Sequence, residues 1–198
     1  MQPEVTAAYA SRAAEYVRVL GSMDAVHPSD RVHVATWAAT CAGPLVDLGC
    51  GPGHWTASLA AAGHDVVGVD PVPELVDLAR RAFPDVPFRV GSVEQPGCAD
   101  GTVGGVLAWY SLIHLEPHEL PAALAAIARL LVPGGRVLVG FFDGDAVKPF
   151  PHAVTTAYRW SVEAMSVALE AAGFVVEETH RRTGPGHRPH AAVSAVLG

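Results

Sequence analysis

Residues 45–53 read LVDLGCGPG, a short apolar run that ends in three glycines spaced one residue apart. The apolar part predicts a buried strand over Leu45–Leu48, and a helix is expected to begin near Gly53. Such a strand-to-helix turn exposes backbone N–H groups and a helix N-terminus at the crevice beyond the strand ends. Because glycine lets a ligand approach the backbone closely, this stretch predicts a ligand-binding loop.

On both sides of this loop, Val- and Leu-rich runs alternate with Ala-rich helical patterns, which predicts β-α-β units. Strands are expected at 45–48, 65–69, 86–90, 103–109, 137–142, 174–179 and 191–197, and helices at 5–20, 29–40, 53–63, 73–83, 116–131 and 161–173. The last two strands should pair antiparallel across the turn at 183–187. The fold class is therefore α/β: a doubly wound, mostly parallel seven-stranded Rossmann-like sheet with an antiparallel last strand and an N-terminal helical lid.

Composition excludes several classes of function. The net charge of −7 provides no cationic field for nucleic acid. No apolar run approaches the roughly 18 to 20 residues of a membrane span, and the N-terminus lacks a signal-peptide pattern, so we expect a cytoplasmic protein without membrane contact. Cys41, Cys50 and Cys98 contain no C-x-x-C pair and are expected to be reduced thiols.

An acidic residue accompanies the glycine loop. Asp70 lies at the tip of the second predicted strand, about 20 residues after Gly49, where a carboxylate can accept hydrogen bonds from two ribose hydroxyls. Both features favour an adenosine nucleoside, although Asp70 could instead cap the following helix. A dinucleotide-binding G-x-G-x-x-G loop would place its third glycine at position 54, which is His54 here.

The spacing G-x-G-x-G after the acid Asp47 resembles motif I of class I S-adenosylmethionine-dependent methyltransferases of the small-metabolite type. The resemblance spans about residues 45–180 and includes Asp70, GSVE at 91–94 and LLVPGG at 130–135. It implies S-adenosyl-L-methionine as the cofactor and methyl transfer to a small-molecule acceptor by in-line displacement. It also implies a single domain, 1–198, with a helical lid (1–43), a cofactor-binding core (44–142), a substrate cap loop (143–160) and a C-terminal helix and hairpin (161–198).

In this family the glycine loop packs against the methionine portion, the strand-2 acid holds the ribose, and residues after strand 3 frame the adenine. The family often has Asp where this chain has Ser92, so adenine binding is expected to depend on the Val93 backbone. Residues 9–16, YASRAAEY, are similar to an N-terminal helix whose arginine can face the cofactor carboxylate. The expected cofactor-binding residues are Asp47, Gly49, Cys50, Gly51, Gly53, Trp55, Asp70, Pro71, Ser92, Val93, Ala108, Arg12 and Tyr16.

Methyl transfer from a sulfonium requires a positioned nucleophile and removal of its proton. His114 follows the fourth predicted strand at the crevice edge, where an imidazole can accept that proton, and Tyr110 is expected to line the methyl site. These are the predicted catalytic residues; the alternatives are a histidine that caps a helix and a core tyrosine with a bonded hydroxyl.

Residues 143–159 are expected to be irregular, and the cap loop 143–160 is expected to cover the acceptor. The substrate-binding residues predicted in it are His152, Tyr158, Arg159 and Trp160. Alternatively, Trp160 packs into the core and Arg159 lies on the surface. No metal is expected, because no carboxylate completes a ligand set with His114 and His118.

Three functional classes remain open at this point: a small-molecule methyltransferase, the same fold using the cofactor for a reaction other than methyl transfer, and a non-catalytic nucleotide-binding module. A mostly apolar lid and cap are compatible with O, N, S or C acceptors and with a homodimer.

Overall fold

A computed structural model of the chain describes residues 3–184 and 187–198, without the side chains of Tyr16, Val19, Leu20 and His187. Its main feature is a seven-stranded sheet with the order β3-β2-β1-β4-β5-β9-β8. The strands are β1 (Leu45–Leu48), β2 (Val66–Asp70), β3 (Phe88–Val90), β4 (Val103–Trp109), β5 (Leu131–Phe142), β8 (Phe174–Gly184) and β9 (His187–Leu197). β9 runs antiparallel to both its neighbours, β5 and β8, which confirms the predicted fold class.

The fully buried strand β1 lies at the centre and pairs in parallel with both β2 and β4. From β1 the chain first builds β2 and β3 on one side and then returns to build β4 and β5 on the other. The order of strands therefore reverses between β1 and β4, and the loops that leave these strands diverge to open a crevice. The glycine loop lies at this position.

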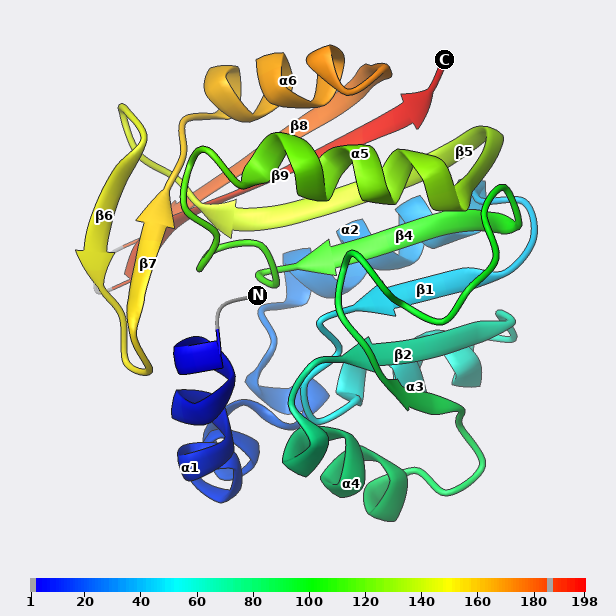
Figure 1. The fold of residues 1–198 in the computed structure, drawn as a ribbon, viewed down its shortest axis with the longest axis vertical. Coiled ribbons are helices and arrows are strands. Elements are labelled where there is room, and N and C mark those ends of the chain that lie inside the picture. The colour runs from blue at the N-terminus through cyan, green and yellow to red at the C-terminus, as the bar shows by residue number, and fades with distance from the viewer. Residues whose placement is uncertain (1–2, 185–186) are drawn as a thin grey trace.

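Helices cover both faces of the sheet (Figure 1). They are α1 (Pro3–Leu20), the 3-10 turn η1 (Met23–Ala25), α2 (Pro28–Thr40), α3 (His54–Ala61), α4 (Pro73–Ala82), α5 (Leu120–Leu130) and α6 (Val162–Ala171). α5 and α6 bury their apolar residues in one core cluster, whereas α2 and α3 pack into a second cluster around Leu45 and Leu107. Ser161 caps α6, because its hydroxyl accepts a hydrogen bond from the Ala164 N–H at 3.1 Å.

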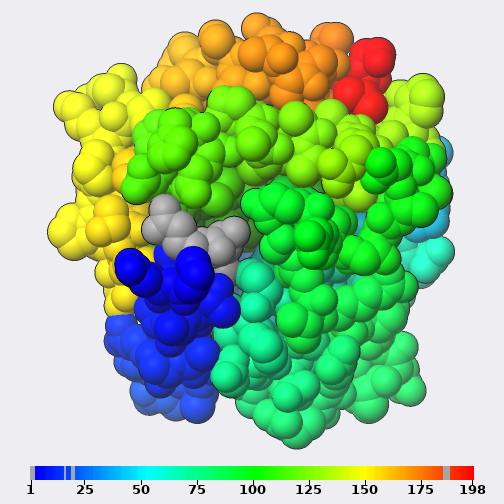
Figure 2. All heavy atoms as spheres, in the orientation of Figure 1, coloured from blue at the N-terminus to red at the C-terminus, as the bar shows by residue number. Residues whose placement is uncertain are grey.

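Two elements lie at the end of the sheet toward which β1 and β4 point (Figure 1). One is α1, which lies beside α4 (Figure 2). Ala13 of α1 packs there in one cluster with Val72 and Leu75. The other is a hairpin of β6 (Lys148–Pro151) and β7 (Thr156–Arg159). The expectation of an irregular segment at 143–159 was therefore wrong. Phe150 and Ala157 face each other in this hairpin and are both buried, which fixes its register, but two prolines obscure the alternation in the sequence.

Element boundaries differ from prediction mainly around α5. The helix begins at Leu120 rather than Glu116, because the side chain of Glu119 accepts the Glu116 N–H at 2.7 Å and holds the preceding residues in turns. β5 begins at Leu131 rather than residue 137, so residues 133–135 lie within the strand, where its pairing with β4 is irregular. In the described part of the chain, no helix is both long and apolar enough to cross a membrane.

Candidate active site

The glycine loop is tightly packed. Gly49 has a φ of +77°, and a Cβ there would lie 2.2 Å from the Cβ of Ser111. Gly53, at the N-cap of α3, has a φ of +84°, and a Cβ would lie 2.6 Å from the ring of Phe88. Since both the conformation and the space require glycine, the loop presents backbone rather than side chains to the crevice.

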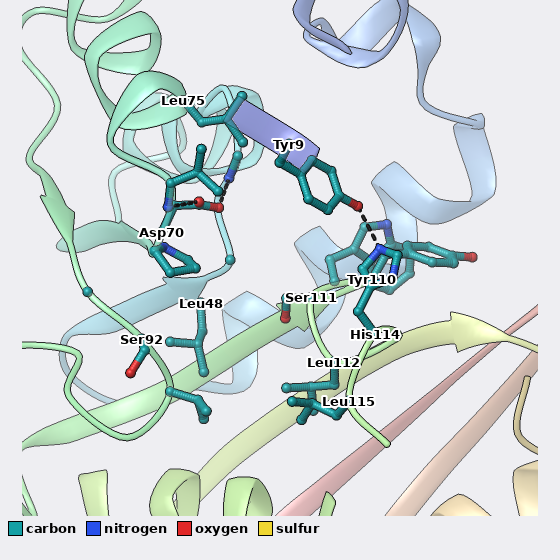
Figure 3. Close-up of a pocket in the computed structure, with 17 residues that line it drawn as sticks. Tyr9, Leu48, Asp70, Leu75, Ser92, Tyr110, Ser111, Leu112, His114 and Leu115 are labelled. Carbon is teal, nitrogen blue, oxygen red and sulfur yellow. Dashed lines mark hydrogen bonds between the residues drawn. The ribbon is translucent and has the colours of Figure 1, made fainter. Parts of the chain in front are cut away.

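Asp70 joins β2 to this loop. Its carboxylate is 5% exposed and accepts hydrogen bonds from the N–H of Gly51 at 2.9 Å and of Val72 at 2.8 Å (Figure 3). It is not a helix cap, because α4 begins after Val72 with no side-chain cap. Each carboxylate oxygen has two lone pairs, so Asp70 can accept further hydrogen bonds from a ligand. Burial raises the pKa of Asp70 to about 6, against the lowering effect of the two backbone donors.

One crevice brings together six of the thirteen predicted cofactor residues (Figure 3). Gly49, Gly51, Asp70 and Pro71 line it on one side, and Ser92 and Val93 line it further along. Apolar side chains complete its walls: Leu48, Val72, Leu75, Leu112 and Leu115. A buried carboxylate between a glycine loop and apolar walls fits the ribose and base of a nucleoside. The residues present therefore fit the adenosine portion of S-adenosylmethionine.

Ser92 makes its own local contacts in this crevice. Its hydroxyl donates a hydrogen bond to the Glu94 carboxylate at 2.5 Å and accepts the Gln95 N–H at 3.3 Å. Because its proton is donated to Glu94, the Ser92 hydroxyl can bind a ligand only as a hydrogen-bond acceptor.

His114 lines the same crevice and is 6% exposed. Its Nδ1 lies 2.7 Å from the carbonyl oxygen of Thr156, which can only accept, so Nδ1 carries the proton. Nε2 is then the acceptor for the Tyr9 hydroxyl at 2.9 Å (Figure 3). Burial lowers the pKa of His114, and the Thr156 contact opposes this shift. The imidazole is thus neutral at pH 7, with its basic nitrogen toward α1.

Tyr110 follows β4 with a φ of 59°, a left-handed conformation that is uncommon for a residue with a side chain. Its hydroxyl forms a hydrogen bond with Nδ1 of His190 on β9. Burial raises the pKa of Tyr110 above its usual range, so the phenol stays protonated. The bonded hydroxyl anticipated for a core tyrosine is present, yet Tyr110 also lines the crevice.

A second and larger cavity, of about 680 Å³, adjoins the crevice. The two share the lining residues Tyr9, Gly49, Gly51, Trp109 and Tyr110. The larger cavity also contains four of the predicted residues, namely Asp47, Cys50, Trp55 and His152. The sequence-based expectation had placed the first three with the cofactor and His152 with the acceptor.

Asp47 is buried at the wall of the larger cavity. Its carboxylate accepts a hydrogen bond from the Thr56 hydroxyl of α3 at 2.6 Å. Burial raises the pKa of Asp47 to about 7, and the neighbouring charge of Asp70 adds to this effect. This acid therefore anchors the first turn of α3 to β1.

Several predicted residues lie outside both cavities. Ala108 is fully buried in the core, and Gly53 contacts Phe88 and Ala79. The Arg12 guanidinium binds Glu15 and the Ala153 carbonyl, so it fastens α1 to the β6–β7 hairpin instead of pointing at the crevice. The side chain of Tyr16 lies outside the described residues.

The predicted cap residues that follow His152 contact the body of the protein instead of the cavities. Tyr158 donates its backbone N–H to Ile113, and the Arg159 guanidinium lies 4.8 Å above the Phe150 ring. Trp160 is 8% exposed and belongs to the core, as its alternative interpretation held. Neither cavity is lined by any of these three residues.

Sequence reasoning missed the partners that the fold brings in from a distance. Phe142, Arg182 and His190 reach the larger cavity from β5, β8 and β9. Arg182 forms a two-pronged ion pair with Asp30 of α2, at 3.2 and 2.8 Å. An arginine and an aspartate more than 150 residues apart carry no mutual signal in a single sequence, because only the packed sheet brings them together.

Comparisons with known proteins agree with this geometry. Residues 45–135 match the family model described as a methyltransferase domain. An uncharacterised methyltransferase of Mycobacterium tuberculosis is 31% identical over 167 residues, which are 73% of this chain and 67% of the relative. The 2-heptyl-1-hydroxyquinolin-4(1H)-one methyltransferase of Mycobacteroides abscessus is 30% identical over 142 residues, 64% of this chain and 62% of that protein.

Among solved structures, the fold matches the Burkholderia thailandensis 1,6-didemethyltoxoflavin-N1-methyltransferase with bound 1,6-didemethyltoxoflavin and S-adenosylhomocysteine. The TM-score is 0.80 at 24% sequence identity, covering 98% of this chain and 87% of that one. The chain therefore belongs to the class I S-adenosylmethionine-dependent methyltransferases. It is an enzyme of this family, and its cofactor is S-adenosylmethionine.

The raised pKa of Asp70 predicts that cofactor affinity depends on pH. In the role predicted for Asp70, ribose hydroxyls would donate to the ionised carboxylate, so binding would require Asp70 to lose its proton. With a pKa of about 6 in the free protein, the affinity for S-adenosylhomocysteine should fall about tenfold between about pH 7 and pH 5. Calorimetry across this range measures the effect. Asp70→Asn should flatten the profile, and an unchanged profile in that variant would contradict the assignment.

Proposed function

We propose that this enzyme methylates a small-molecule acceptor held in the larger cavity, with His114 and Tyr110 at the methyl-transfer position. The observation that carries the proposal is the shared wall: Gly49, Gly51 and Tyr110 line both the cofactor crevice and the larger cavity. An acceptor in the larger cavity would therefore lie directly against the cofactor's methionine end. The small-molecule acceptor suggested by the relatives' printed names is consistent with this arrangement.

The residues divide into those that hold the cofactor and those that act on the acceptor. Asp70 would hold the ribose, the glycine loop the methionine portion, and Ser92 and Val93 the adenine edge. When bound, S-adenosylmethionine supplies a methyl carbon that moves to the acceptor atom as the carbon–sulfur bond breaks and its electron pair stays on sulfur. The protein's remaining tasks are orientation, exclusion of water and removal of a proton.

His114 is suited to take that proton. Its Nδ1–H donates to the Thr156 carbonyl, which fixes the orientation of the ring and leaves Nε2 without a proton. Nε2 can therefore accept a proton. An acceptor hydroxyl or N–H would replace the Tyr9 hydroxyl at Nε2 and pass its proton there. Tyr110, held by His190, would position the acceptor without itself ionising.

The experiment that tests this proposal has two parts. Calorimetry should show micromolar binding of S-adenosylhomocysteine, and incubation with S-adenosylmethionine and a panel of phenols, amines, thiols and N-heterocycles should release S-adenosylhomocysteine with at least one acceptor. Binding without turnover across the panel would favour the alternative of a cofactor used for other chemistry. A protein that binds NAD but not S-adenosylhomocysteine would overturn the assigned crevice.

The N-terminal helix is proposed to act as a lid. Tyr9 of α1 lines both cavities and contacts His114, while Ala13 packs on Val72 and Leu75 beside the crevice. Deletion of residues 1–20 should weaken cofactor binding, because it opens the crevice to water, while circular dichroism should show an intact sheet. Full affinity in the truncated protein would contradict the lid.

A further inference from the structure

A continuous series of aromatic rings runs along the wall of the larger cavity. Trp55 and Trp109 meet at a centroid distance of 5.7 Å and an angle of 65°, and Trp109 and Tyr110 at 5.6 Å and 84°. Tyr110 and Phe142 follow at 5.1 Å, and Phe142 and His152 at 5.7 Å. Each ring is held edge-on or tilted by its neighbour, so the rings support one another and form an aromatic wall against which a flat occupant can pack.

Two imidazoles in this wall have unmet hydrogen-bonding capacity. His54 and His152 both line the cavity, and Nδ1 of each is buried with no hydrogen-bond partner among the described residues. Burial lowers the pKa of both to about 4, so both rings are neutral at pH 7 and each offers one donor and one acceptor. Rotation about χ2 exchanges the two ring edges, so either nitrogen can be turned toward an occupant.

Four of the five charged side chains that line the cavity are paired within the protein, and the fifth, Asp24, is exposed. Asp30 is neutralised by the two-pronged contact from Arg182, and Asp47 accepts the Thr56 hydroxyl. Arg31 donates to the Val26 carbonyl. A cationic amine would therefore have to compete with Arg182 for the buried carboxylate of Asp30, whereas an uncharged ligand leaves these pairs intact.

We propose that the acceptor is a flat, uncharged aromatic nitrogen heterocycle that carries a ring N–H or hydroxyl together with a second polar atom. This inference rests on the proposed methyl-transfer function and specifies its substrate class. The aromatic series fits the flat ring system, and His54 and His152 fit two polar atoms on its edge. A hydrocarbon ring would leave both imidazoles unpaired, and a saturated amine would lose the stacking.

The test uses the protein saturated with S-adenosylhomocysteine, which fills the crevice without reacting. Calorimetry then compares quinolin-4-one, which is flat with one N–H and one carbonyl, with decahydroquinoline, which has the same skeleton but is saturated and cationic. Quinolin-4-one should bind at least about tenfold more tightly. Equal or stronger binding of decahydroquinoline would overturn the substrate class.

Two variants test whether the preference for quinolin-4-one depends on the larger cavity. His152→Ala and His54→Ala should each weaken quinolin-4-one binding about tenfold, because each removes one hydrogen-bonding partner. The control His118→Ala alters an exposed histidine outside both cavities and should change nothing. If neither cavity variant changes the affinity for quinolin-4-one, the inference is refuted. The proposed methyltransferase function would still stand, provided that S-adenosylhomocysteine binds normally. Failure of S-adenosylhomocysteine to bind would overturn the proposed function and this inference with it.

Discussion

His114→Ala is expected to lower turnover about a hundredfold while leaving the affinity for S-adenosylhomocysteine nearly unchanged. The reason is that Nε2 is the acceptor in a ring whose other nitrogen is fixed by the Thr156 carbonyl, so the variant removes the group proposed to take the acceptor's proton. Single-turnover rates with any acceptor identified in the panel measure the effect. His118→Ala, at an exposed position, is the matched control.

His114→Ala also removes two hydrogen bonds, so folding must be separated from chemistry. His114→Gln keeps an amide that can bond to Thr156 and Tyr9 but cannot accept a proton, and it should be as slow as the alanine variant. Added imidazole should restore part of the rate in His114→Ala. Normal turnover per folded molecule, combined with a lowered melting temperature, would mean that His114 only joins α1 to the hairpin.

Asp70→Ala is expected to weaken cofactor binding about thirtyfold, or about 2 kcal/mol, because it removes the charged acceptor proposed for the ribose hydroxyls. The same change leaves the N–H groups of Gly51 and Val72 without their acceptor, so the melting temperature should fall as well. Calorimetry with S-adenosylhomocysteine gives the first quantity and a thermal melt gives the second.

The matched control for Asp70 is Asp77→Ala, which removes an exposed carboxylate from the neighbouring helix α4. It should alter neither affinity nor melting temperature by more than a small amount. A normal affinity in Asp70→Ala at a temperature where the protein is folded would disprove the ribose-binding role and leave only a structural one.

The residues around the crevice could be predicted because each follows a strand closely in the chain. Gly49 directly follows β1, Asp70 ends β2 and Val93 lies shortly after β3, and the carboxyl ends of parallel strands meet at one edge of the sheet. A strand pattern and a short turn were therefore enough to place them. The cofactor itself came from the resemblance of the glycine spacing to a known motif.

The residues that line the larger cavity could not be predicted as well, for a physical reason. Trp160 and Arg159 looked like cap residues because they follow a loop, but β7 directs Trp160 into the core and stacks Arg159 on Phe150. Conversely, Phe142 and His190 reach the cavity because β5 and β9 are paired at their ends, a register that the hydrophobic pattern alone did not reveal. Tyr9 was noted only as part of a helix, and its contact with His114 depends on how α1 packs.

The ion pair between Asp30 and Arg182 has a consequence for the order in which the enzyme is assembled. Apart from Tyr9, the crevice is built from residues 48–115, whereas the larger cavity needs α2 and the far end of β8 to be tied together. During synthesis the N-terminal part of a chain becomes available for folding first. The strands that carry the glycine loop and Asp70 can therefore form while the C-terminal hairpin is still in the ribosome, whereas the contact between Tyr110 and His190 and the acceptor cavity form last.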